Sequence, residues 1–212
     1  MKNKLGNILG IISLISIVLY AVFFSLPRKQ FSETLLVYSL LFLGLYFFYK
    51  FTVSAFQQNF RFFPYKWSTR FFESDSLLFI FIAGLSFRLT LLTYTPNLSQ
   101  DFFRFIWDGH QLLNGFNPYL YLPDNVIKND FSHIPNATLL HANMGALSSS
   151  NYTNYPPFNQ LLFAIAAFLG GKSITATIIW MRILVIAAEI GIFIYGIKLL
   201  QLLGKPPYLI LL

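Results

Sequence analysis

The amino-acid sequence predicts an all-α membrane protein, built as a polytopic bundle of transmembrane helices. Of its 212 residues, 56% are hydrophobic and 11% are charged, whereas a soluble domain carries about 25% charged residues. The apolar residues form runs of about 20, the length that a helix needs to cross the hydrocarbon core of a bilayer. These two observations predict about five spans and the start of a sixth.

Composition also bears on partners and cofactors. The formal net charge is +7, but the basic residues are scattered and flank apolar runs, which is typical of topology signals and not of nucleic-acid binding. Cysteine is absent, which excludes disulfides and thiolate metal sites. The three histidines are scattered, so no cofactor is expected; a divalent metal is compatible with the sequence but no ligand cluster indicates one.

Residues 1–75 are predicted to form a transmembrane hairpin and a basic cytoplasmic loop. Apolar runs at 5–26 and 31–51 are separated by a basic turn at 27–30. The first run is too long for the apolar core of a signal peptide and has no clean cleavage site. We therefore expect it to remain as a membrane anchor.

The distribution of basic residues predicts the orientation. Two lysines near the N-terminus favour a cytoplasmic N-terminus, and alternation then places residues 52–75 inside. That loop has three basic residues, Arg61, Lys66 and Arg70. The long loop after the third span has only two and is expected outside, although Arg28 and Lys29 of the first turn would also lie outside.

Residues 76–212 are predicted to form the transmembrane core. Its expected spans are residues 76–95, 157–169 and 174–203, and a long extracytoplasmic loop at 96–156 interrupts them. A loop of this length is usually functional or disordered, and this one is too aromatic for simple disorder. Because a new apolar run begins at residue 208, we expect the chain to be an N-terminal fragment of a longer protein.

The loop contains one predicted short helix. Ser99 is a candidate N-cap, and Asn114-Gly115 is a stop signal. Four polar residues share one face of this helix through their spacing: Asp101, Arg104, Asp108 and Gln111. A narrow charged stripe beside a broad aromatic face predicts a helix lying at the membrane interface.

The stripe has two explanations that the sequence leaves open. In the structural one, Asp101 stabilises the first turn through the helix dipole, and Arg104 and Asp108 form an i,i+4 ion pair. In the functional one, these side chains form a site on an extramembrane loop.

Three ionisable residues fall inside predicted spans: Arg88, Arg182 and Glu189. Charge at that depth is costly unless it is paired or hydrated. Arg88 is expected either to reach the interface or to contact an anion such as a lipid phosphate. Arg182 and Glu189 lie seven residues apart, about 10 Å along one helix, so each is expected to pair with another helix.

Three motifs follow one another across the loop. The first has Asp101, Arg104, Phe105, Trp107, Asp108 and Gly109; the second has Gly115, Asn117, Pro118 and Tyr119; the third has Tyr155, Pro156 and Pro157. In order and spacing they resemble the signature of bacterial multi-spanning glycosyltransferases of the GT-C class, specifically polyprenyl-phosphate-mannose-dependent mannosyltransferase-like proteins. The resemblance covers about residues 77–203, and His110 departs from it by standing where a basic residue, often Arg, is expected.

This resemblance implies a multi-pass protein of the bacterial inner membrane that moves a sugar from a polyprenyl-phosphate donor to an extracytoplasmic glycan or lipid acceptor. Mannose is the sugar that the resemblance favours. Asp101 is then the general base, and Arg104 or Arg88 holds the departing lipid phosphate. Asp108 orients Arg104 or binds sugar hydroxyls. The remaining candidate substrate-binding residues are Trp107, His110, Asn117, Tyr119 and Tyr155.

Two alternatives remain. A glycolipid transporter or flippase would also need intramembrane charges, but it predicts internal repeats and broken helices at the midplane, and the sequence has no internal repeat. A noncatalytic membrane subunit predicts that Asp101 can be replaced without effect. A soluble nucleotide-sugar enzyme is disfavoured, because the chain has neither a glycine-rich phosphate loop nor a D-x-D pair.

Overall fold

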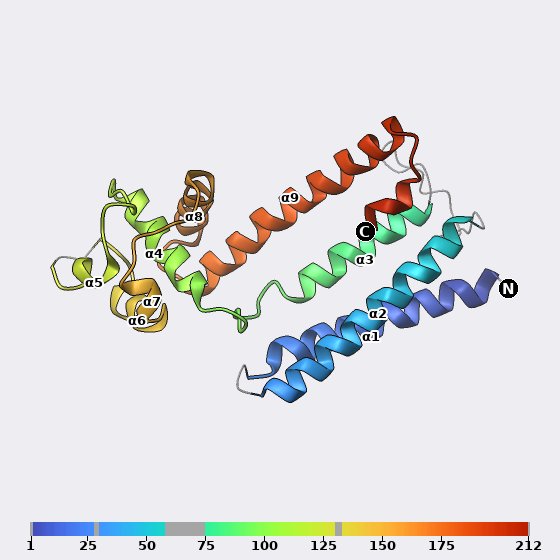
Figure 1. Ribbon diagram of the computed structural model, residues 1–212, viewed down its shortest axis with the longest axis horizontal. Coiled ribbons are helices and arrows are strands. Elements are labelled where there is room, and N and C mark those ends of the chain that lie inside the picture. The colour runs from blue at the N-terminus through green and yellow to red at the C-terminus, as the bar shows by residue number, and fades with distance from the viewer. Residues whose placement is uncertain (1, 28–29, 58–74, 130–132, 212) are drawn as a thin grey trace. The chain divides into compact units, whose positions relative to one another are not determined.

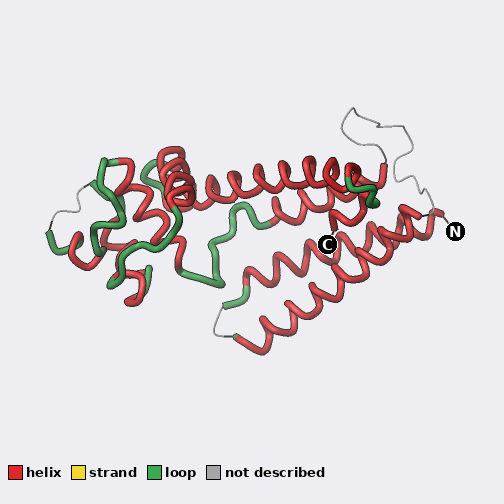
Figure 2. The backbone as a smooth tube through the Cα atoms, turned by 45° about the horizontal axis from the view of Figure 1, so that its top comes forward, coloured by secondary structure: helices red, strands yellow, loops and turns green. Residues whose placement is uncertain are grey.

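The computed structural model describes residues 2–27, 30–57, 75–129 and 133–211 (Figure 1). Over these residues it contains helices and no strand (Figure 2), which confirms the predicted all-α class for the part described. The α-helices are α1 Lys2–Ser25, α2 Phe31–Gln57, α3 Asp75–Thr90, α4 Asp101–Leu113, α5 Pro123–Val126, α6 Ala137–Asn143, α7 Ala146–Ser149, α8 Pro157–Gly170 and α9 Ile174–Leu202; a 3-10 helix, η1, covers Pro207–Leu211. The predicted basic loop with Arg61, Lys66 and Arg70 lies outside the described residues.

Three of the helices are long and apolar enough to cross a membrane. They contain the segments Gly6–Ser25, Phe31–Ser54 and Ile174–Leu202. The other two predicted spans are the shorter apolar helices Leu77–Thr90 and Pro157–Gly170, which fall below the roughly 20 residues that a bilayer core requires. A count of five spans therefore remains a prediction.

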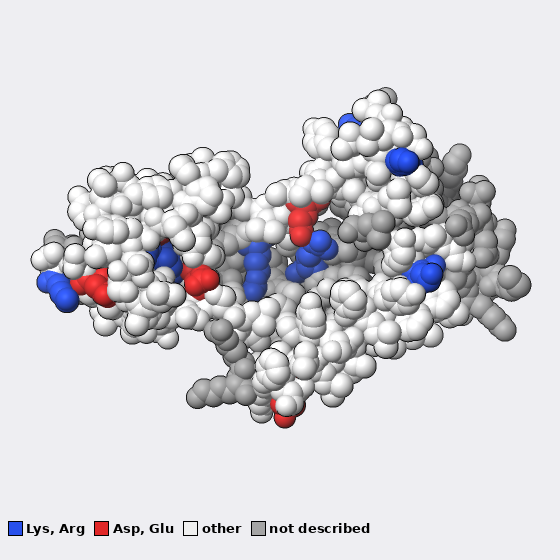
Figure 3. Space-filling model, in the orientation of Figure 1, with Lys and Arg blue, Asp and Glu red and all other residues white. Residues whose placement is uncertain are grey.

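The chain divides into two compact units. One comprises Met1–Leu91 with Ile186–Leu212, and the other comprises Leu92–Val185. In the first unit α1 and α2 run antiparallel as a hairpin (Figures 1 and 2). A small core of Leu9, Phe48, Ala83 and Phe87 joins this hairpin to α3. On the face drawn in Figure 3, charged side chains form a few small spots, some with acidic and basic groups side by side, among uncharged residues.

The second unit is built around α4. This helix packs along α8 and also contacts α6 and α7 (Figure 1). Its core contains Ile106 and Trp107 from α4 with Leu140 and Met144 from the α6 region, and all four side chains are almost completely buried. All six residues of the first motif thus lie on a helix that is covered on several sides.

Gly109 explains how α4 and α8 come so close. A Cβ atom at this position would lie 2.5 Å from the backbone oxygen of Phe163 and 2.8 Å from its carbonyl carbon. Real Cβ atoms do not approach backbone this closely, so the last residue of the W-D-G triplet must be glycine for the two helices to pack as they do.

Candidate active site

The ends of α4 follow from its sequence. The backbone N–H of Asp101 donates to the Ser99 hydroxyl at 3.1 Å, although the residue at the N-cap position is Gln100 and not the predicted Ser99. At the other end Gly115 has φ +81°, which glycine adopts readily, and the Phe116 N–H donates to the Gln111 carbonyl at 3.0 Å. This is the helix stop predicted from Asn114-Gly115.

Asp101 lies in the first turn of α4 and is partly exposed. Aromatic rings surround this end of the helix: Tyr155 meets Phe105 edge-on at 4.9 Å between centroids, and Phe105 stacks on Phe163 at 4.4 Å. Burial raises the pKa of the Tyr155 phenol, and the negative charge of Asp101 raises it further. Asp101 and Tyr155, which are 54 positions apart in the sequence, are therefore electrostatic neighbours.

Arg104 and Asp108 form the predicted i,i+4 ion pair, with Arg104 Nε 2.7 Å from Asp108 Oδ1. Three of the four side chains of the polar stripe are buried inside this unit. Arg104 is 2% exposed, Asp108 0% and Gln111 1%. Arg104 Nη1 also donates to the backbone oxygens of Ser148 and Asn151, the latter at 3.0 Å, so this guanidinium ties the segment before α8 onto α4.

Gln160 completes the pair from α8. Its Nε2 donates to Asp108 Oδ2 at 3.0 Å and to the Thr153 hydroxyl at 2.8 Å, and its side chain is 2% exposed. Sequence reasoning missed this residue. The available signal was an amide in the first turn of an otherwise apolar helix, where a buried polar group needs a partner.

The protonation of Asp108 reflects two opposing effects. Burial raises the pKa of its carboxyl, and the positive charge of Arg104 and the hydrogen bonds from Gln160, Arg104 and Thr153 oppose that rise. Removal from water dominates because the carboxylate is fully enclosed. In this structure Asp108 is a buried anchor for Arg104, and its oxygens are not accessible to a sugar hydroxyl.

The other predicted substrate-binding residues of this unit occupy different settings. Trp107 is fully buried against α6, its ring 6.2 Å from that of His141. His110 is also buried, and burial lowers its pKa. Asn117 accepts a hydrogen bond from the Tyr119 N–H at 3.0 Å, which stabilises the turn, and the Tyr119 hydroxyl donates to the Tyr155 carbonyl at 2.5 Å. The second and third motifs are thereby linked.

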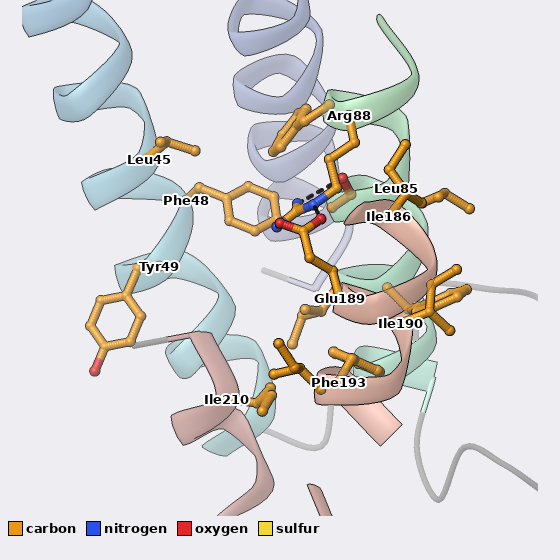
Figure 4. A pocket seen from close by; sticks show the side chains of 15 residues that line it. Leu45, Phe48, Tyr49, Leu85, Arg88, Ile186, Glu189, Ile190, Phe193 and Ile210 are labelled. Atoms are coloured by element: carbon orange, nitrogen blue, oxygen red, sulfur yellow. Dashed lines mark hydrogen bonds and ion pairs between the residues drawn. The ribbon is translucent and has the colours of Figure 1, made fainter. Parts of the chain in front are cut away.

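Arg88 belongs to the first unit, not to the unit that holds α4. It donates from Nε and Nη2 to the two oxygens of Glu189, with the Nη2–Oε1 distance 3.0 Å, and from Nη1 to the Gly84 carbonyl (Figure 4). The pair borders a largely apolar cavity of about 460 Å³ lined by α2, α3, α9 and η1. Glu189 thus pairs with another helix, as expected, and Arg182 donates to the Leu92 carbonyl at 3.0 Å.

No cluster of three or more His, Asp or Glu side chains suited to a metal ion is found within the described part of the chain. Near Asp101 the described residues offer a partly exposed carboxylate with the Tyr155 ring as its neighbour. Such a carboxylate can accept a proton from a hydroxyl group, and aromatic faces can contact the apolar side of a ligand.

Comparison with known proteins identifies the family. A search of curated proteins and a search of solved structures each returned no match. A family model matches residues 29–211, and its description is alpha-(1->6)-mannopyranosyltransferase, N-terminal domain, of the MptA_B family. Together with the three long apolar helices, this match indicates a membrane protein that acts on sugar substrates. The chain belongs to the alpha-(1->6)-mannopyranosyltransferase family and is a glycosyltransferase.

Proposed function

We propose that this protein is a GT-C type enzyme that transfers mannose from a polyprenyl-phosphate donor to an extracytoplasmic glycan or lipid acceptor, with Asp101 as general base. The observation that carries the proposal is the contrast between the two carboxylates of α4. Asp108 is completely buried and paired with Arg104. Asp101 is partly exposed, and within the described residues its carboxylate has no ion-pair partner.

The chemistry follows from that contrast. Asp101 takes the proton of the acceptor hydroxyl while the acceptor oxygen attacks the anomeric carbon of the donor sugar. The bond from that carbon to the phosphate oxygen breaks, and its electron pair leaves with the lipid phosphate. Tyr155 and Phe105, which border Asp101, supply rings on which a sugar face can stack.

Transfer also requires a cation to stabilise the leaving phosphate, and Arg104 and Arg88 are the two predicted candidates. Arg104 is committed to Asp108 and two backbone carbonyls, and Arg88 is committed to Glu189. A phosphate-binding role for either arginine requires it to exchange its present partners for the donor. The structure favours Arg104 as an organiser of the loop rather than a direct ligand.

The test is sugar transfer from labelled polyprenyl-phosphate-mannose in membranes that contain the protein, with Asp101→Asn beside the wild type. We expect transfer to fall by a factor of roughly 10² to 10⁴, the usual contribution of a general base. Asp124→Asn is the matched control, because Asp124 is a partly exposed carboxylate in the same unit and pairs with His141. Unchanged transfer in Asp101→Asn would remove the base assignment, whereas an absence of transfer in the wild type would favour a noncatalytic subunit or a transporter.

A further inference from the structure

The buried ion pair of α4 has a third member whose role the proposed mechanism does not use. Gln160 reaches Asp108 from α8, 52 positions away in the sequence. Its Nε2 has two acceptors, Asp108 Oδ2 and the Thr153 hydroxyl. Because a carboxylate offers acceptors only, the amide nitrogen is the group suited to this position.

The network joins three segments around the first turn of α4. Asp108 holds Arg104, and Arg104 holds the carbonyls of Ser148 and Asn151. Thr153 continues that segment and accepts from Gln160. Tyr155 follows two residues later and is the electrostatic neighbour of Asp101. Hydrogen bonds and chain connectivity therefore link Gln160 to Tyr155, the neighbour of the proposed base Asp101.

We propose that Gln160 is a positioning residue for the transfer reaction, holding the Asp108 carboxylate against Arg104 so that the segment leading to Tyr155 is fixed beside Asp101. The proposal rests on the proposed function for the identity of the base. Gln160 touches neither donor nor acceptor in this scheme. It acts through Asp108, and its effect depends on the charge of that carboxylate.

The surroundings of Asp108 predict how the effect varies with pH. Its charged and titratable neighbours are Arg104 on α4 and Tyr155 before α8; on the α6 side, His141 packs against Trp107 and is paired with Asp124. Burial already raises the pKa of Asp108, and the Gln160 hydrogen bond opposes that rise. Loss of the bond must raise this pKa further, so Asp108 loses its charge, and releases Arg104, at a higher pH.

The experiment compares the pH dependence of transfer in wild type and Gln160→Met, which keeps the length of the side chain and removes its hydrogen bonds. We expect kcat to fall about tenfold or more near neutral pH, the effect of one hydrogen bond to a charged group. We also expect the acidic limb of the profile to move to higher pH, because loss of the hydrogen bond raises the pKa of Asp108. Gln111→Met is the control, because Gln111 is equally buried on α4 and has no hydrogen bond to Asp108 within the described residues.

A lower rate in Gln160→Met with an unmoved acidic limb would overturn the proposal, because a purely structural defect lowers activity at every pH alike. If Gln160→Met does not fold, the pH profile of Thr153→Val tests the proposal instead. Its hydroxyl also lowers the pKa of Asp108, so the isosteric variant must move the limb in the same direction by a smaller amount, and an unmoved limb in Thr153→Val counts against the proposal.

A second readout separates this proposal from the assignment of Asp101. The thermal midpoint of unfolding in detergent is measured between about pH 4.5 and 7.5 for wild type and Gln160→Met. A carboxyl with a raised folded-state pKa lowers stability as pH rises from its unfolded pKa to its folded pKa. Buried His110 contributes in the opposite direction, but equally in both proteins, so the gap in midpoint between wild type and variant must widen as pH rises. This result stands even if Asp101→Asn keeps full transfer, and a gap that stays constant with pH would contradict the role of Gln160.

Discussion

Asp108 and Arg104 form an ion pair 2.7 Å long in which neither side chain is more than 3% exposed. Removing one partner of such a pair leaves a buried charge without compensation, which costs about 3–5 kcal/mol. We expect Asp108→Asn to lower the free energy of unfolding by roughly that amount. Denaturant unfolding in detergent is the measurement.

The double variant Asp108→Leu with Arg104→Met provides the matching control. Since it removes both charges, it is expected to lose less stability than Asp108→Asn. If the single variant lost less than about 1 kcal/mol, a value typical of exposed pairs, the burial of this pair would be disproved.

Gly109 offers a test of the packing of α4 against α8. A Cβ atom there would lie 2.5 Å from the Phe163 backbone oxygen, and backbone cannot move aside as a flexible side chain can. We expect Gly109→Ala to destabilise the protein by about 1–3 kcal/mol, the usual cost of overpacking. Gly191→Ala is the control in another helix, because a Cβ at Gly191 meets no atom within 4 Å; equal midpoints of unfolding for the two variants would argue against the close approach.

His110 predicts a pH dependence of stability with a definite sign. Burial lowers its pKa, so the folded protein resists protonation while the unfolded chain takes up a proton near pH 6.5. Stability is therefore complete above that value and is lost as pH falls toward the folded-state pKa. Between about pH 7.5 and 5.5 the thermal midpoint of the wild type should therefore drop relative to that of His110→Gln; parallel curves would show that His110 makes no such contribution.

The local features of the site could be predicted from the sequence, and its burial could not. The ion pair of Arg104 and Asp108 is fixed by helical spacing, and the stop at Gly115 by turn chemistry. What covers the polar stripe depends on segments far along the chain: Arg104 bonds to carbonyls 44 and 47 positions away, and Gln160 lies 52 positions from Asp108. A stripe of charges on a short helix has the same pattern whether water or protein lies over it.

The same limit applies to the membrane unit. Hydropathy located α9 to within one residue, and it located α1 and α2 to within three and six residues at their ends, since each needs only its own apolar run. Arg88 and Glu189 are 101 positions apart, and no periodicity within α3 or α9 links them. Glu189 pairs with another helix as predicted, whereas Arg182 donates to a carbonyl in the turn after α3, and the identity of each partner comes from tertiary packing.

Asp101, the partly exposed carboxylate of α4, is proposed to act in the chemical step, and separate values of kcat and KM distinguish that role from substrate binding. For Asp101→Asn, measured with labelled polyprenyl-phosphate-mannose, we expect kcat to be lower by a factor of roughly 10² to 10⁴ with KM for donor and acceptor nearly unchanged. A raised KM with an unaltered kcat would instead make Asp101 a binding residue, and would contradict its assignment as the general base.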